Sequence, residues 1–79
     1  MAKAFTELQG QYLSFIYHYT KVHRRPPAQW DIQQYFRTTG PSVHQMIVRL
    51  EQNGLLRRVP GQARAIEVLV PPEELPPLE

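Results

Sequence analysis

The chain has 79 residues, no cysteine and a formal net charge of +2 at pH 7. This length allows one domain with one small core and leaves little room for an enzyme built from a pocket and several long loops. Without cysteine, neither a disulfide framework nor a cysteine zinc site can hold the fold. No apolar run approaches the ~20 residues that cross a bilayer, and no signal peptide begins the chain, so we expect a cytoplasmic protein without a membrane partner.

The basic charge is concentrated in the body of the chain. Residues 1–70 carry nine bases and four acids, a net charge of +5, whereas residues 71–79 carry three acids and no base. A basic body with a short acidic tail suggests a polyanionic partner. The three histidines, His18, His23 and His44, match no metal-ligand pattern, so neither a metal nor a cofactor is expected.

The segment Thr6-Glu-Leu-Gln9 has the pattern of a capping box at the start of a helix. Apolar residues then recur at helical spacing and predict a helix over about residues 7–22. The residues of this predicted core face are Leu8, Tyr12, Phe15, Ile16 and Tyr19.

The prolines of residues 23–27 end the first helix, and a short second helix is predicted over residues 29–36. Ala28 would be a poor cap for it. Its inward face would hold Ile32, Tyr35 and Phe36. Trp30 lies roughly opposite Ile32; we expect it to pack against the side of the first helix, with contact to a partner as the alternative.

A third helix is predicted over about residues 40–52. A threonine cap followed by proline in the first turn marks its start, and Asn53-Gly54 supplies a left-handed stop. Its apolar residues fall within about 60° of one another on a helical wheel, the width of a buried stripe. They are Val43, Met46, Ile47 and Leu50.

Two strand-like runs follow, Leu55–Val59 and Ala65–Val70, joined by a turn at Pro60–Arg64. The tail, residues 71–79, is proline-rich, and we expect it to be extended and poorly ordered. Three helices and a hairpin within residues 1–70 describe a mainly α fold with a small β-hairpin, the winged helix-turn-helix.

The outward face of the third helix is polar but lacks the Glu and Lys of an ordinary solvated face at its centre. Gln can bond an adenine edge twice, Arg can do the same to guanine, and valine can meet a thymine methyl. Ser42 near the helix start can bond a phosphate. An ordinary surface helix remains the alternative for this face alone. The residues of the outward face are Ser42, His44, Gln45, Val48, Arg49 and Gln52.

The predicted wing shifts the balance towards DNA. Arg57, Arg58 and Arg64 lie on its arms and Gln62 at its tip, so a basic hairpin would stand beside a polar helix. Together they would form one footprint for a phosphate backbone. Arg24, Arg25 and Arg37 could extend that footprint or could be solvated loop charges.

With these elements in view, residues 5–70 resemble the N-terminal DNA-binding domain of LexA-type repressors. The resemblance lies in Phe-Thr-Glu-Leu-Gln, Arg-Pro-Pro, Pro-Ser-Val-His-Gln-Met with Arg-Leu-Glu-Gln-Asn-Gly-Leu-Leu, and Pro-Gly-Gln-Ala-Arg-Ala-Ile-Glu-Val-Leu. It implies a bacterial transcriptional regulator whose third helix enters the major groove. The family's base-reading positions match Pro41, Ser42, His44 and Gln45.

Several departures from that family limit what the resemblance implies. The family has acids where His44 and Gln45 stand, so a different target sequence is expected. It usually has Ser or Thr where Ala28 stands, and often glycine in the turn before the third helix. Its repressors continue into a self-cleaving protease domain that residues 1–79 do not include, so this chain is expected to act as a stand-alone DNA-binding domain.

The prediction is therefore a sequence-specific regulator, a repressor by resemblance, that binds double-stranded DNA as a homodimer and has no catalytic activity. No Ser/His/Asp set and no phosphate-binding glycine loop supports an enzyme. The alternative is an interaction module that docks a protein through the same outer face, anchored by Val48 with Trp30 and Leu69.

Overall fold

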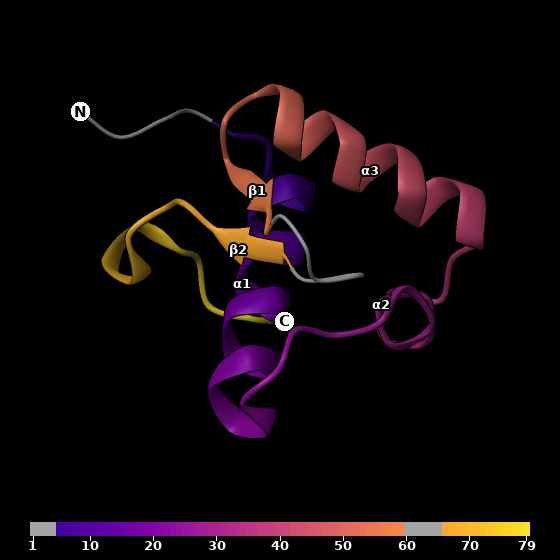
Figure 1. The fold of residues 1–79 in the computed structure, drawn as a ribbon, viewed down its shortest axis with the longest axis horizontal. Helices are drawn as coiled ribbons and strands as arrows, with labels where there is room; N and C mark the ends of the chain where they lie inside the picture. Colours follow the sequence, from indigo (N-terminus) through magenta and orange to yellow (C-terminus); the bar gives the residue numbers. More distant parts are fainter. Residues whose placement is uncertain (1–4, 60–65) are drawn as a thin grey trace.

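The computed structural model describes residues 5–59 and 66–79 and contains the predicted order of elements (Figure 1). Three helices precede an antiparallel hairpin, and a short 3-10 helix, η1, follows it. The elements are α1 (Glu7–His23), α2 (Gln29–Phe36), α3 (Gly40–Gln52), β1 (Leu56–Arg58), β2 (Ile66–Val68) and η1 (Pro72–Glu74). Each helix agrees with its predicted range to within one residue.

The start of α1 is the predicted capping box. The hydroxyl of Thr6 accepts from the backbone N–H of Gln9 at 3.1 Å, and the Gln9 side-chain oxygen accepts from the Thr6 N–H at 2.9 Å. Two backbone donors that have no partner within the helix are thereby satisfied. At the other end, Arg24 adopts a left-handed conformation with φ 60°, and its N–H bonds the carbonyl of Thr20.

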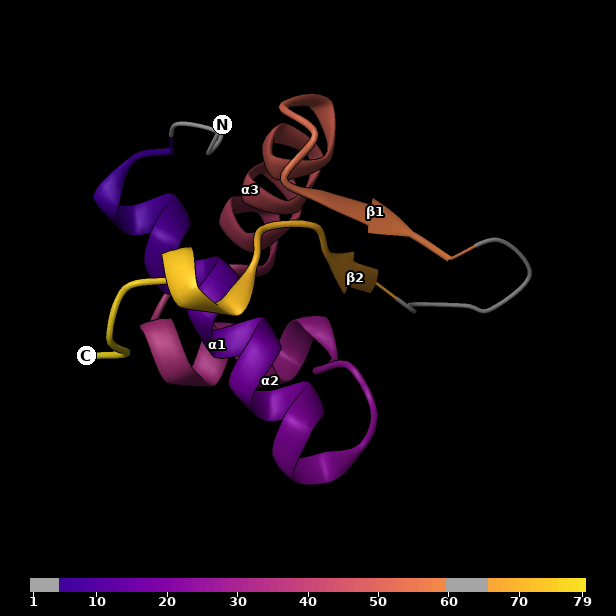
Figure 2. The ribbon, with the colours of Figure 1, turned by 90° about the vertical axis from the view of Figure 1, so that its left-hand side faces the viewer.

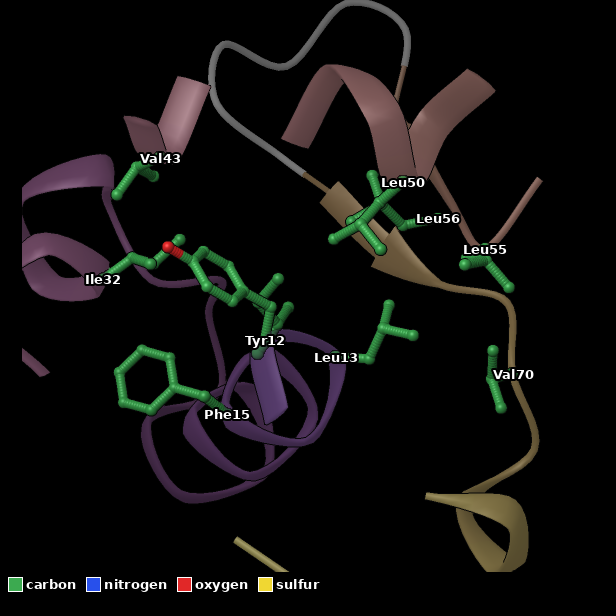
Figure 3. Close-up of a cluster of buried hydrophobic side chains, with 10 residues drawn as sticks. Tyr12, Leu13, Phe15, Ile32, Val43, Leu50, Leu55, Leu56 and Val70 are labelled. Atoms are coloured by element: carbon green, nitrogen blue, oxygen red, sulfur yellow. The ribbon is translucent and has the colours of Figure 1, made fainter. Parts of the chain in front are cut away.

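The hydrophobic core surrounds the first half of α1, where every residue from 9 to 16 is buried. Figure 3 shows Tyr12 and Leu13 of α1 between Ile32 and Val43 on one side and Leu55 and Val70 on the other. The prediction that Leu8 belongs to this core is wrong, since its side chain is 52% exposed. Leu13, which the expected core face left out, is fully buried. The prediction assumed that only one stripe of α1 is buried. It is incomplete because the other elements cover α1 on more than one side.

Helix α2 is attached to the core through Ile32 and an aromatic cluster. Tyr12 stacks on Phe36 with ring centroids 4.2 Å apart, and Phe15 stacks on Tyr35 at 4.5 Å. Tyr35 nevertheless keeps 40% of its surface exposed, so its predicted inward position is only half right. We expected Trp30 to pack against the side of α1, but 64% of its surface is exposed.

The N-terminus of α2 compensates in part for the lack of a capping side chain at Ala28. The carboxylate of Asp31 accepts from the backbone N–H of Ala28 at 2.8 Å, which is half of a capping box. The same carboxylate oxygen accepts from the hydroxyl of Tyr19 at 3.3 Å. Asp31 therefore both caps α2 and joins it to α1.

The hairpin is shorter than the two predicted runs but has the predicted alternation. Leu56 pairs with Val68, Arg57 with Glu67 and Arg58 with Ile66. Beyond the strands, the N–H of Leu69 still bonds the carbonyl of Leu55 at 2.9 Å. Figure 2 shows the hairpin beginning beside the C-terminal end of α3 and projecting away from the helices. The predicted turn at Pro60–Arg64 lies outside the described residues.

The prediction that the tail is poorly ordered is wrong: residues 71–79 lie against α1. The side-chain amide of Gln11 donates to the carbonyl of Pro77 and accepts from the N–H of Glu79, both at 2.9 Å. The hydroxyl of Ser14 donates to the carbonyl of Pro76 at 2.8 Å. Leu75 and Leu78 pack against the core. The tail thus completes the domain instead of trailing from it.

Gly10 makes the close approach of the tail possible. A Cβ atom at this position would lie 2.8 Å from the Phe5 ring and 3.0 Å from Cγ of Pro76. Any side chain here would therefore overlap the tail or Phe5.

None of the helices in the described part of the chain combines the length and the apolar character that a membrane span requires.

Candidate nucleic-acid interface

Helix α3 is held at both ends by specific backbone interactions. The hydroxyl of Thr39 accepts from the N–H of Ser42 at 3.3 Å and donates to its hydroxyl at 2.9 Å. At the far end, Gly54 has φ 71°, and its N–H bonds the carbonyl of Glu51 while the N–H of Leu55 bonds that of Leu50. This is a Schellman motif, which fixes where the helix stops and the hairpin starts.

The turn between α2 and α3 brings the two helices close together. The side-chain amide of Gln29 in the first turn of α2 donates to the carbonyl of Gly40 at 3.0 Å. A Cβ at Gly40 would lie 3.3 Å from the same amide, so a larger residue would press against it. The bond ties the start of α3 to the start of α2.

The two sides of α3 differ as predicted. Val43 and Leu50 are fully buried, and Met46 and Ile47 pack against the core as partly buried residues. The opposite side carries the residues of the predicted outward face, together with Pro41 at the start of the helix. We call this side the outer face of α3. Its polar residues are exposed: Ser42, His44, Gln45, Arg49 and Gln52. Val48 is half-buried instead of fully exposed.

Five residues of this outer face line a shallow hollow of about 330 Å³. They are His44, Gln45, Val48, Arg49 and Gln52. Val48 is the one apolar residue of this lining and is half-buried, whereas the other four are polar and exposed. The hollow offers hydrogen-bond donors and acceptors beside an apolar contact, which is the combination that reads base edges.

The two described wing arginines lie on different sides of the hairpin. Arg58 shares a side with buried Leu56, because alternate residues of a strand face the same way. It donates from Nε to Oε1 of Glu51 in α3 at 3.1 Å. Arg57 lies on the opposite side and donates to Oε1 of Glu67 at 2.9 Å. Of these two arginines, only Arg58 is thereby joined to α3.

The hydrogen bond and the charge of Glu67 raise the pKa of Arg57 above its ordinary value. Both arginine side chains remain about half exposed, so solvent screens these ion pairs. A phosphate group can therefore replace either carboxylate at modest cost. Arg64 and Gln62, the other predicted wing residues, lie outside the described residues.

The arrangement defines the class of protein. This is a winged helix-turn-helix domain. It has a buried stripe on α3, a short turn from α2 to α3 and an antiparallel hairpin directly after α3. Within the described residues, no group of three or more His, Asp or Glu side chains could hold a metal ion.

The sequence places this domain in one family. Residues 2–65 match the family described as LexA DNA binding domain, and the chain belongs to that family. It is also 35% identical over 68 residues to the LexA repressor of Bartonella quintana (strain Toulouse). The match covers 85% of this chain and 29% of that repressor, so the chain spans less than a third of the relative's length.

Proposed function

We propose that the chain is a sequence-specific double-stranded DNA-binding domain of a bacterial transcriptional repressor. The observation that carries the proposal is the outer face of α3. Gln45, Arg49 and Gln52 are exposed and line a shallow hollow together with half-buried Val48. Membership of the LexA DNA binding domain family supports it, as does the relative, which is a repressor by name.

In this proposal α3 enters the major groove and the hairpin follows the phosphate backbone. Gln45, Arg49 and His44 would meet base edges, Val48 a thymine methyl, and Ser42 and Pro41 the groove wall near the start of α3. Arg58 would exchange Glu51 for a phosphate. Gln52, Arg57, Gln62 and Arg64 complete the proposed set, with the wing arginines on phosphates or in the minor groove.

One winged helix touches only a few base pairs, so useful specificity requires a second copy. Two domains related by a two-fold axis would bind the half-sites of a palindrome. We therefore propose a homodimer on DNA, acting in the cytoplasm at the nucleoid. The resemblance to LexA-type repressors implies acids where His44 and Gln45 stand, so we propose that the preferred half-site differs from theirs.

The test is selection from a random duplex library, followed by binding measurements with single variants. Gln45→Ala should change the preferred sequence. Arg58→Ala should weaken binding to all duplexes alike and reduce the salt slope by about one phosphate contact.

Chemical-shift mapping with a duplex separates this function from a protein-docking module. Shifts in α3 and the hairpin support DNA binding. If no duplex binds at low salt, the DNA-binding proposal is wrong, and a protein partner for the same surface becomes the better explanation.

A further inference from the structure

A second cavity lies beside the outer face of α3, between the start of α2, α3 and the hairpin. Its volume is about 400 Å³. Its walls come from the three elements that the helix-turn-helix and wing bring together. They are Pro27, Ala28, Gln29, Trp30, Ile32, Val43, His44, Ile47, Arg58 and Ile66. We call this the Trp30 cavity.

One wall of the Trp30 cavity is the exposed side chain of Trp30. Trp30 is the only tryptophan of the chain, and 64% of its surface is exposed. An indole with that much free surface gives little to the stability of the fold, because its apolar area remains in water. Its flat apolar face and its N–H donor are both available to a ligand.

The remaining walls have a consistent chemistry. Ile47 and Ile66 are apolar, while His44, Gln29 and Arg58 supply donors. None of the described residues that line it is a carboxylate, but Arg58 is paired with Glu51 of α3. The cavity therefore favours a negatively charged ligand that takes the place of Glu51 at the guanidinium.

The Trp30 cavity is continuous with the outer face of α3 through one residue. His44 lines both this cavity and the shallow hollow of Gln45, Val48 and Arg49. A duplex that places base edges over the hollow must carry its sugar-phosphate backbone past the groove edge. The Trp30 cavity lies where α2 and the hairpin border that face.

We propose that the Trp30 cavity binds the sugar-phosphate backbone of duplex DNA, with the indole of Trp30 against a deoxyribose and Arg58 on a neighbouring phosphate. A deoxyribose presents C–H groups that suit an aromatic face, and the phosphates on both sides of it accept hydrogen bonds. Trp30 is thus an additional DNA contact on α2, outside α3 and the wing. This inference rests on the proposed function, since it needs a duplex on the outer face of α3.

Because Trp30 is the sole tryptophan, its fluorescence reports on this cavity alone. The wild-type protein is titrated with a fluorescein-free duplex from the library selection while emission and acrylamide quenching are recorded. Binding of the same duplex is followed separately by anisotropy of a labelled copy. Exclusion of water from the indole should shift its emission and reduce its accessibility to acrylamide at the same duplex concentrations that saturate the anisotropy.

Variants then measure how much the contact contributes. Trp30→Ala should weaken binding roughly three- to tenfold, the same factor on selected and random duplexes, because a backbone contact carries no sequence information. The salt slope should not change, since no charge is lost. Trp30→Phe should restore part of the affinity. Val22→Ala is the control, because it trims another exposed apolar side chain in the last turn of α1.

The outcomes distinguish the two proposals. If the duplex saturates the anisotropy while Trp30 emission and quenching stay unchanged, this inference is overturned and the proposed function stands. If Trp30→Ala binds all duplexes as tightly as the wild type, the contact is likewise excluded. If no duplex binds the wild-type protein, the proposed function itself fails.

Discussion

Arg58 of β1 and Glu51 of α3 are joined by an ion pair of 3.1 Å, which links the hairpin to the helix that we propose enters the groove. The two side chains are about half exposed, so the pair adds at most about 1 kcal/mol to the stability of the fold. Its larger effect is on function. Glu51 holds the Arg58 guanidinium beside α3 and at the same time neutralises the charge that a phosphate would bind.

Glu51→Gln should therefore tighten DNA binding. The substitution frees the Arg58 guanidinium and removes a negative charge that would stand near the backbone. We expect a gain of roughly three- to tenfold at low salt, a steeper salt dependence and a nearly unchanged melting temperature. Anisotropy titrations at two salt concentrations measure the first two, and thermal unfolding measures the third.

The matched control is Glu67→Gln, which frees Arg57 on the other side of the hairpin. If only the side that faces α3 meets DNA, this variant should gain less affinity than Glu51→Gln. Equal gains from both variants would mean that only net charge matters and that the Glu51–Arg58 pair has no special position.

The tail should contribute measurably to stability through Gln11. Its side-chain amide bonds both Pro77 and Glu79, and it is buried. Gln11→Ala leaves a carbonyl and an N–H of the tail without their partner, at a cost of about 1–3 kcal/mol. Chemical denaturation gives the loss, and hydrogen exchange at the Glu79 amide should become faster. Gln34→Ala, an exposed glutamine of α2, should change neither quantity.

The helices and the hairpin could be predicted because local signals mark them. Thr6 and Thr39 cap, Gly54 stops α3, and Ile66, Val68 and Val70 alternate with Glu67 and Leu69. These patterns depend only on neighbours in the chain, so they can be found without knowing the tertiary structure.

The docked tail could not be predicted in the same way. Its proline content is typical of extended segments, and its contacts on α1 are more than 60 residues away in sequence. The one available signal was the presence of Gly10, Gln11 and Ser14 inside an otherwise apolar helix. Small and amide residues leave room for another segment of the chain to approach closely and can hydrogen-bond its backbone.

The same distinction applies to the candidate interface. Helical periodicity predicted which side of α3 faces outward, and the exposure of Gln45, Arg49 and Gln52 agrees with it. The pairing of Arg58 with Glu51 and the exposure of Trp30 depend on how the hairpin and α2 sit against α3. Tertiary packing decides the Arg58–Glu51 pair and the exposure of Trp30, so the pattern of a single helix or strand could not predict either.

Arg37→Gly should stabilise the fold. Arg37 ends α2 with φ 53°, in the left-handed region where a side chain costs about 1–2 kcal/mol and glycine costs nothing. Part of the gain is lost because glycine makes the unfolded chain more flexible, which leaves a net gain of about 0.5–1 kcal/mol. Chemical denaturation gives the value.

The control for that prediction is Arg37→Ala, which removes the charge but keeps a Cβ in the strained conformation. It should show little or no gain. If Arg37→Ala stabilises as much as Arg37→Gly, the gain comes from the lost charge and not from the backbone.

Alkaline unfolding should depend on Tyr12, whose hydroxyl is directed towards Ile32 inside the core (Figure 3). Burial raises the pKa of Tyr12 above its ordinary value of 10.0. The unfolded chain therefore loses the Tyr12 proton first as pH rises. The stability that protonated Tyr12 contributes is fully present below about pH 10 and is lost as the pH rises through the higher pKa of the folded state. Tyr12→Phe removes the titrating group and should lose less stability than the wild type between about pH 8 and pH 11. Urea denaturation of both proteins at the two pH values gives the difference; an equal loss in both would show that Tyr12 does not contribute to alkaline unfolding.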